Sequence, residues 1–262
     1  MIPTALTIAG SDPSGGAGIQ ADLKTFTVLN VYGMAVIAAL TAQNTVGVCG
    51  VMDVPVDFIA AQLDAVMSDI PPRAVKTGML GSAAAVQLVA RKLREYRVQL
   101  VVIDPVMVSS SGTLLLERQG IDALKRDLLP LAELITPNLA EAAELSGIEV
   151  RNLAGMEQAA RRIHAMGARH VLVKGGHLEG DALDVFFNGA DIVHLRAERI
   201  STANLHGTGC VLSAAITGGL ALGQTLAEAV TGAKEFVAVA IRGNLSLGKG
   251  AGPIDPLAFP RR

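Results

Sequence analysis

Short apolar runs alternate along the chain with longer segments in which apolar residues recur at helical spacing. Alternation of this kind is typical of α/β proteins, in which helices cover both faces of a mostly parallel sheet. No repeat, low-complexity tract or linker divides the chain, so residues 1–262 are predicted to form a single domain. The short runs predict strands at 5–8, 36–39, 74–77, 100–103 and 171–173. The longer segments predict helices at 19–29, 58–67, 84–93, 140–146, 156–166, 211–222 and 226–241.

Polar residues and glycines follow the predicted strands. Ligands of parallel sheets bind beyond the carboxyl ends of the strands, so these residues are the first candidates for a functional site. They are Gly10-Ser11-Asp12, Gln43-Asn44, Gly78-Met79, Asp104-Pro105, Pro137-Asn138 and Lys174-Gly175-Gly176.

Composition narrows the kind of ligand. The formal net charge of −2 provides no basic field for nucleic acid, and a chain with no Trp has little material for base stacking. No apolar run approaches the roughly 20 residues that cross a bilayer, and the segment Met1-Ile2-Pro3-Thr4 lacks the features of a signal peptide. Two cysteines in 262 residues argue against a disulfide framework. We therefore expect a cytoplasmic protein that acts on a small ligand, without nucleic-acid or membrane partners.

Two glycine-rich segments are similar to nucleotide-binding motifs but lack the context that those motifs require. Gly16-Ala17-Gly18-Ile19-Gln20-Ala21 fits the dinucleotide fingerprint, yet no acidic residue occurs between Asp22 and Asp53. Residues 243–250 almost form a Walker A loop, but Gly250 stands where Ser or Thr would hold magnesium. We interpret the first segment as a loop that passes close to a ligand, and the second as a loop after the last long helix.

The strongest candidate for a phosphate site is His206-Gly207-Thr208-Gly209-Cys210, directly before the apolar helix predicted at 211–222. Free backbone N–H groups point outward at a helix start, and the helix dipole favours negative charge there. A plain glycine-rich turn that caps the helix would have the same sequence. The position alone leaves both interpretations open.

Cys210 adds a reactive group to this segment. A thiol in the first turn of a helix is expected to have a lowered pKa, because the local positive potential stabilises the thiolate. Such a group could act as a general base and take the proton of a substrate hydroxyl while the amides hold the transferring phosphate. The alternative for a cysteine is a small buried hydrophobic residue. We interpret Cys49, between Val48 and Gly50, in that way.

Further polar groups at the same predicted edge suit phosphates and a divalent cation. Lys174 leaves a strand before two glycines and could reach a phosphate, whereas a lysine at an apolar strand end otherwise needs a partner. Asp104, Asn138 and Glu141 offer oxygen ligands of the kind that Mg²⁺ prefers. By themselves, Asn138 and Glu141 are expected to form a helix capping box, and Asp104 a turn. Together with the candidate base, the set indicates phosphoryl transfer.

Seven sequence blocks span nearly the whole chain: Ala9–Phe26, Thr41–Thr45, Lys76–Leu80, Asp104–Met107, Thr136–Leu139, Val173–His177 and His206–Cys210. They resemble those of the bacterial hydroxymethylpyrimidine/phosphomethylpyrimidine kinases and occur in the same order. The resemblance implies a three-layer ribokinase-like α/β fold and phosphorylation that uses ATP and Mg²⁺ in thiamin biosynthesis. The first acceptor would be the hydroxymethyl oxygen of 4-amino-5-hydroxymethyl-2-methylpyrimidine, and the second the phosphate of the resulting monophosphate.

The resemblance also implies roles for single residues. A carboxylate and an amide suit the edge of an aminopyrimidine, and a methionine and a valine suit the walls around its ring. In the family, the pyrimidine is held near the residues that match Gly10, Asp22, Gln43, Met79 and Val106. Gly207, Thr208 and Gly209 would form the anion hole, Lys174 would contact phosphate, Cys210 would be the base, and Asp104, Asn138 and Glu141 would bind magnesium and phosphate oxygens.

Two alternatives remain open. A pyridoxal kinase of the same fold is the nearer one, because such enzymes closely resemble this family. Gln43 favours the pyrimidine, since pyridoxal-directed relatives tend to carry an apolar residue there. A catalytically impaired pyrimidine- or nucleotide-binding protein is supported only by Leu205 and Val211, where the family usually has threonine. Relatives often form homodimers, so we expect a homodimer, although no stretch identifies its surface.

Overall fold

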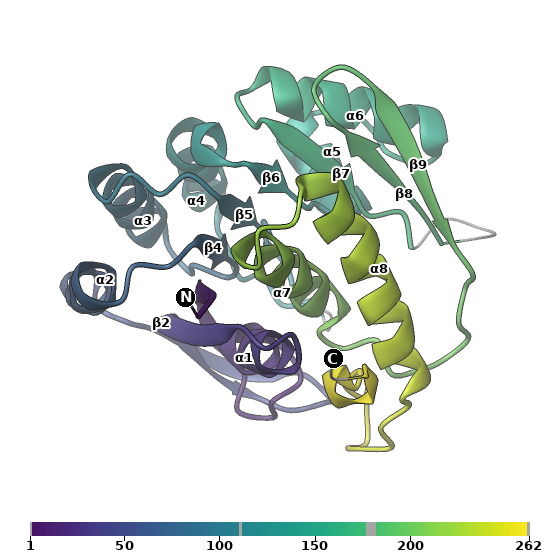
Figure 1. Cartoon of the computed structure of the whole chain (residues 1–262), viewed down its shortest axis with the longest axis horizontal. Helices are drawn as coiled ribbons and strands as arrows, with labels where there is room; N and C mark the ends of the chain where they lie inside the picture. Colours follow the sequence, from purple (N-terminus) through teal and green to yellow (C-terminus); the bar gives the residue numbers. More distant parts are fainter. Residues whose placement is uncertain (1, 110–111, 177–181, 261–262) are drawn as a thin grey trace.

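The computed structural model describes residues 2–109, 112–176 and 182–260. Within these ranges, nine strands form one sheet in the order β3-β2-β1-β4-β5-β6-β7-β8-β9 (Figure 1). The strands from β2 to β7 in this order run parallel, whereas β3 pairs antiparallel with β2 at one edge, and at the other β8 pairs antiparallel with β7 and β9 antiparallel with β8. The predicted α/β class with a mostly parallel sheet is confirmed. The strands are β1 (Thr4–Ser11), β2 (Tyr32–Gln43), β3 (Val48–Asp53), β4 (Ala74–Thr77), β5 (Val101–Ile103), β6 (Leu134–Ile135), β7 (His170–Val173), β8 (Ala182–Phe187) and β9 (Ile192–Ala197).

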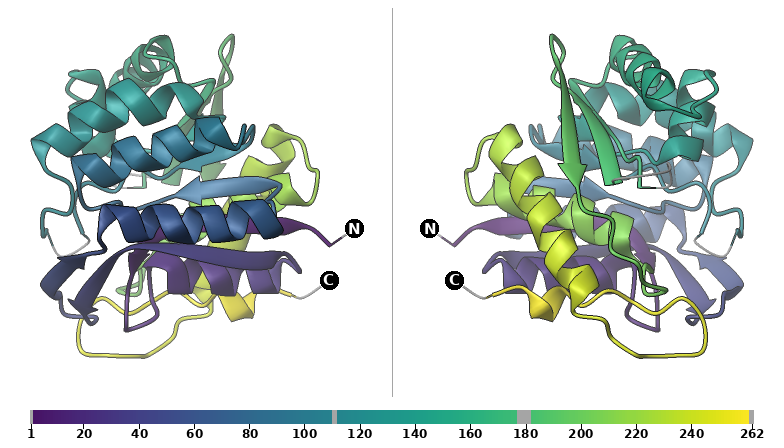
Figure 2. Two further views of the ribbon diagram at one scale, coloured as in Figure 1. Left: turned by 90° about the vertical axis from the view of Figure 1, so that its left-hand side faces the viewer. Right: turned by 90° about the vertical axis from the view of Figure 1, so that its right-hand side faces the viewer.

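Helices lie on both faces of this sheet. Figure 2 shows α2 to α6 in front of the sheet on one side, and α7 and α8 in front of it on the other. They are α1 (Gly18–Val28), α2 (Val56–Asp69), α3 (Ala83–Glu95), α4 (Arg118–Ala123), α5 (Leu139–Ser146), α6 (Leu153–Ala165), α7 (Thr208–Ala221) and α8 (Leu226–Arg242). A π-helical turn (Leu124–Leu128) and a 3-10 turn (Leu129–Leu131) follow α4, and a second 3-10 turn (Pro256–Ala258) lies near the carboxyl end of the chain. None of the helices in the described part of the chain is long and apolar enough to span a bilayer.

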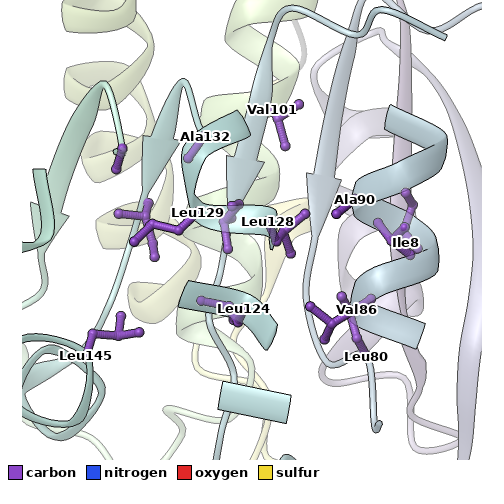
Figure 3. Packing of buried hydrophobic residues seen from close by; sticks show 14 of the residues in the cluster. Ile8, Leu80, Val86, Ala90, Val101, Leu124, Leu128, Leu129, Ala132 and Leu145 are labelled. Carbon is purple, nitrogen blue, oxygen red and sulfur yellow. The ribbon is translucent and has the colours of Figure 1, made fainter. Parts of the chain in front are cut away.

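Alternate strand residues supply two separate cores, as the period of two in a strand requires. On β1, Leu6 and Ile8 join the core under α2 to α6, whereas Ala5 joins the core under α1, α7 and α8. Figure 3 shows the first core, where Leu124 and Leu128 of the π-helical turn lie among side chains of α3 and the sheet.

Every predicted strand and helix is present, but the prediction missed the exposed strands β3 and β9, the very short β6 and α4, and also β8, whose last four residues are buried. Most residues of β3 and half of β9 are exposed, so neither strand has an apolar run. The strand β6 has two residues and α4 has six. Cys49 on β3 is exposed, so its predicted burial is wrong. An edge strand with a solvated face does not enclose its small residues.

Helix α7 is buried from Val211 to Ala221, because it lies between the sheet and the helices α1 and α8. A helix that is apolar all round requires this kind of enclosure. Gly218 permits the close approach to α1, since a Cβ there would lie 2.8 Å from a methyl carbon of Leu29. The enclosure fixes the start of α7 at the carboxyl ends of the parallel strands.

The chain reverses its direction of sheet growth at β1. It passes from β1 to the neighbouring β2, adds β3 outside it, and then returns to form β4 on the other side of β1. Ligands of open α/β sheets bind in the crevice at the carboxyl ends of strands that flank such a reversal. This topology selects the ends of β1, β2 and β4 for the site.

Candidate active site

The start of α7 has the geometry of an anion site. Gly207 is its N-cap and has φ +80°, in the left-handed region that favours glycine. A Cβ on Gly207 would overlap the carbonyl oxygen of Gly16, so the backbones of the two loops lie in direct contact at this point. No side chain caps the helix. The hydroxyl and the N–H of Thr208 both donate to the carbonyl of Leu205, at 2.7 and 3.2 Å, which leaves the N–H groups that follow Thr208 in the first turn of α7 for a ligand.

Lys174 and Asp104 form an ion pair beside this helix start. The Lys174 Nζ lies 3.0 Å from Asp104 Oδ1, and the hydroxyl of Ser213 on α7 donates to Asp104 Oδ2 at 3.3 Å. A Cβ on Gly209 would lie 3.2 Å from the Lys174 Nζ, so the ammonium group lies against the glycine loop. The partner expected for Lys174 is therefore present. Asp104 is 2% exposed and belongs to this pair rather than to a solvated turn.

The electrostatics of the pair keep both groups charged. Burial alone would raise the pKa of Asp104, but the charges of Lys174 and Lys76 hold it below its ordinary value. Burial would lower the pKa of Lys174, whereas the carboxylates of Asp104 and Glu141 raise it. The site thus holds a fixed positive charge where the helix start offers free N–H groups.

Asn138 and Glu141 form the capping box of α5. The Glu141 N–H donates to Asn138 Oδ1 at 2.9 Å, and the Asn138 N–H donates to Glu141 Oε2 at 2.8 Å. Burial raises the pKa of Glu141 to about 7, although the charge of Lys174 opposes the shift. The interpretation of these residues as a capping box is confirmed.

The oxygen donors predicted for magnesium do not form a ready-made cage. Among the described residues, no group of three or more His, Cys, Asp or Glu side chains is placed to hold a metal ion. Asp104 is engaged by Lys174, and Asn138 and Glu141 are engaged by each other. Such a donor set fits Mg²⁺ that takes most of its ligands from water and nucleotide phosphates, the usual arrangement for this ion.

Cys210 lies in the first turn of α7, as predicted, but its predicted acidity is wrong. Burial raises the pKa of this thiol to about 11. The charge of Lys76 and the N–H of Gly18 lower the value, while the Asp104 and Asp22 carboxylates raise it further. Desolvation therefore outweighs the potential of the helix start. Cys210 is a neutral thiol in the ligand-free protein.

A buried ion pair that the sequence did not reveal lies on the face of the sheet that α1 and α7 cover. Lys76 on β4 contacts Asp22 on α1 at 2.6 Å, and both side chains are fully enclosed. The hydroxyl of Thr7 donates to the second Asp22 oxygen at 2.6 Å. Burial would lower the pKa of Lys76, but the charges of the Asp22 and Asp104 carboxylates raise it. The Asp22 carboxylate, expected at the pyrimidine, is not open to a ligand in this conformation.

The other residues expected at the pyrimidine lie at the ends of neighbouring strands. Gly10 ends β1 against Met79, because a Cβ on Gly10 would lie 3.0 Å from the Met79 sulfur. Gln43 ends β2 and is half-buried, with its side-chain nitrogen 3.2 Å from His206 Nε2. Val106 follows β5 in a turn closed by its own N–H and the Asp104 carbonyl at 2.8 Å. The strand ends therefore place these four residues at one edge of the sheet.

Asp12 and His206 connect the two glycine loops, and the sequence assigned neither a role. The His206 Nε2 lies 2.9 Å from Asp12 Oδ2, and both side chains are buried. Asp12 also accepts the N–H groups of Ser14 and Ala17 at 2.9 Å each. Burial would raise the pKa of Asp12, but the hydrogen bonds from His206 and Ser14 hold it below its ordinary value. Asp12 directly follows β1, and His206 directly precedes the glycines at the start of α7. These positions were the only hint in the sequence that the two residues belong to the site.

Comparison with known proteins identifies the family. The sequence profile of the phosphomethylpyrimidine kinases matches residues 12–255. The chain belongs to this family. It is 52% identical over 261 residues to the hydroxymethylpyrimidine/phosphomethylpyrimidine kinase of Rhizobium meliloti, and the match covers 97% of each chain. It is also 52% identical to the thiamine biosynthesis bifunctional protein ThiED of Geobacter sulfurreducens, of which it spans about half the length (51%).

Solved structures of similar proteins have the same fold, and one of them contains a nucleotide. The crystal structure of an ADP complex of Bacillus subtilis pyridoxal kinase matches with a TM-score of 0.92 and 42% sequence identity, over 98% of each chain. The family and this structural relative are kinases, so the chain is a kinase of the same α/β architecture.

Proposed function

We propose that this protein uses ATP to phosphorylate 4-amino-5-hydroxymethyl-2-methylpyrimidine and then the resulting monophosphate, as a step of thiamin biosynthesis. The observation that carries the proposal is the placement of the α7 start and the Lys174–Asp104 pair beside the ends of β1, β2 and β4. One end of this edge offers N–H groups and a cation for phosphates, and the other offers the Gln43 amide and the Met79 thioether for a ring.

Different residues of the site have separate roles in phosphoryl transfer. The N–H groups of Gly207 and Gly209 hold the phosphoryl oxygens, joined by that of Thr208 once it leaves the Leu205 carbonyl, and Lys174 offsets their charge. Cys210 receives the proton of the acceptor hydroxyl. Because burial raises the pKa of this thiol to about 11, only a small share is thiolate at neutral pH. The transfer rate is then expected to rise with pH over the neutral range.

Magnesium would be bound together with the nucleotide. Asp104, Asn138 and Glu141 would hold it, mainly through water, because their oxygens are already partly engaged. The ion would supply neutralisation of phosphate charge.

Product identification tests the proposal. The protein is incubated with Mg-ATP and the hydroxymethylpyrimidine, with pyridoxal as a parallel acceptor, and the products are identified by mass. We expect the monophosphate first and the diphosphate later. The Gln43→Met variant is expected to bind the pyrimidine about 1–3 kcal/mol more weakly, because hydrogen bonds are lost. Phosphorylation of pyridoxal alone would establish instead the second candidate, a pyridoxal kinase, which the match to the Bacillus subtilis enzyme supports.

We further propose a cytoplasmic homodimer in which each chain is a single three-layer ribokinase-like domain. An apolar groove on β2, β3 and α2 offers a surface, lined by Leu40, Met52 and Phe58 among others. Met52 is 61% and Phe58 60% exposed, which is unusual for such side chains unless they are covered by a partner. Light scattering of the wild type and of Phe58→Glu tests this surface. A dimer that the substitution leaves intact would place the contact elsewhere.

A further inference from the structure

Three polar side chains from distant parts of the chain meet at the end of β2. The His206 Nε2 lies 2.9 Å from Asp12 Oδ2 and 3.2 Å from Gln43 Nε2. At the other end of its carboxamide, Gln43 Oε1 lies 3.3 Å from the hydroxyl oxygen of Thr41. This hydroxyl donates its proton to the Ser11 carbonyl at 2.9 Å. Each of these contacts restricts the hydrogen positions of the next.

The carboxylate of Asp12 fixes the first of these positions. Its oxygens accept hydrogen bonds from the Ser14 N–H and hydroxyl and from the Ala17 N–H, so the group is a carboxylate and has no proton to donate. A bare His206 Nε2 would direct a lone pair at this anion from 2.9 Å. The His206 Nε2 must therefore carry hydrogen and donate it to Asp12.

The same hydrogen decides the orientation of Gln43. A protonated His206 Nε2 has no lone pair in the ring plane and cannot accept from a Gln43 NH₂ group at 3.2 Å. A half-turn of the carboxamide exchanges its oxygen and nitrogen at nearly the same positions. The oxygen then shares the Nε2–H of His206 with Asp12 in a three-centre hydrogen bond, in which Asp12 is the nearer acceptor. The NH₂ group donates to Thr41 Oγ1, whose own proton is already committed to Ser11.

We propose that His206, held by Asp12, is a positioning residue that fixes the Gln43 carboxamide with its oxygen toward the imidazole and thereby sets the choice of acceptor ring. The inference rests on the proposed function only in placing the acceptor ring beside Gln43. One lone pair and one N–H of Gln43 remain for a ligand, since each end of the amide has two bonding positions and one is used.

This orientation selects the chemistry of the acceptor. A 4-aminopyrimidine presents a ring nitrogen that accepts and, directly beside it, an amino group that donates, so it matches one N–H and one lone pair side by side. Pyridoxal has no amino group next to its ring nitrogen and offers no such adjacent pair. A carboxamide free to turn would discriminate less, because either end could meet the ring. Restricting the turn converts a general polar contact into a specific one.

The protonation of His206 is measurable without turnover. Nitrogen-15 NMR of the histidine-labelled, ligand-free protein separates protonated from bare ring nitrogens. The His206 signals are identified by their loss in His206→Gln, and His194→Gln, at a surface pair with Glu157, is the matched control. We expect His206 Nε2 to carry hydrogen. A bare Nε2 with hydrogen on Nδ1 would overturn the proposal.

Acceptor competition tests the consequence. In His206→Leu, kcat/KM for the hydroxymethylpyrimidine is expected to fall about tenfold or more, and that for pyridoxal much less, because only the pyrimidine uses both bonding positions of Gln43. His206→Gln can return an N–H to the same place, so it should restore much of the preference. Equal losses for both acceptors, or no rescue by glutamine, would refute the specificity role.

The failure of this inference is distinct from failure of the proposed function. If the wild type phosphorylates neither acceptor, the proposed function fails. The NMR result still decides the directions of the hydrogen bonds that link Asp12, His206 and Gln43. If the wild type phosphorylates the pyrimidine but His206→Leu keeps its preference, only the present inference fails. A His206→Leu protein that does not fold leaves the wild-type NMR measurement as the deciding test.

Discussion

Replacement of Lys76 by methionine should destabilise the protein strongly, because it leaves the Asp22 carboxylate enclosed without its cation. Both side chains are fully buried and their charged atoms lie 2.6 Å apart. Removal of one partner from such a pair costs about 3–5 kcal/mol, since the remaining charge has lost both water and its counterion. The hydroxyl of Thr7 stays as a donor to Asp22 and limits the loss. For a chain of this size, each kcal/mol lowers Tm by about 2–4 °C, so Tm should fall by about 6–20 °C.

Urea unfolding followed by circular dichroism at neutral pH measures the change. The double variant Lys76→Met/Asp22→Leu should recover much of the loss, because it replaces both charges with apolar groups of similar volume. Lys92→Met is the matched control. Its pair with Asp64 is partly exposed at 12% and 45%, and water replaces the lost contact, so the effect should be small. A single Lys76 variant as stable as the Lys92 control would show that the buried pair does not have the electrostatic role described.

Two further predictions concern the start of α7. Gly207→Ala should abolish nucleotide binding and lower stability, because its Cβ would meet the Gly16 carbonyl at a left-handed φ of +80°. Gly223→Ala has a similar φ of +86° but open space around it, so it should lower stability without loss of nucleotide affinity in calorimetry. Equal nucleotide affinities for the two variants would contradict the anion site. In a Cys49→Ser background, alkylation of Cys210 by iodoacetamide should accelerate about tenfold per pH unit up to pH 10, because the thiol pKa lies near 11 and the reactive thiolate forms as pH rises. A rate that levels off below pH 9 in mass-spectrometric time courses would refute the raised pKa.

The sequence predicted most of the elements with strong apolar patterns, and the structure explains why the exposed and the very short elements were missed. Helix α7 was predictable because it is apolar from Val211 to Ala221. The strand β3 was not, because an edge strand with exposed residues has no apolar run. Strand ends also predicted Lys174 and Asp104 at one edge, because parallel strands finish together.

Long-range contacts between side chains were beyond the sequence. Asp22 and Lys76 are 54 positions apart, and Asp12 and His206 are 194 apart. The local spacing of residues along the chain does not predict such a pair. The sign of the Cys210 pKa shift was predicted wrongly for a related reason. Its helix position is local, but the burial that outweighs it comes from distant elements. Local patterns therefore locate the candidate groups, whereas packing sets their chemistry.

The central claim is that Cys210 serves the transfer step at the α7 start while the pyrimidine is bound by other residues. Single-turnover phosphoryl transfer by Cys210→Ala, measured beside the pyrimidine Kd by calorimetry, tests it most directly. The account predicts a transfer rate lower by about 100-fold or more with nearly unchanged Kd, since a general base acts in the transition state. A variant that transfers at the wild-type rate, or that loses rate and affinity in equal measure, would contradict it.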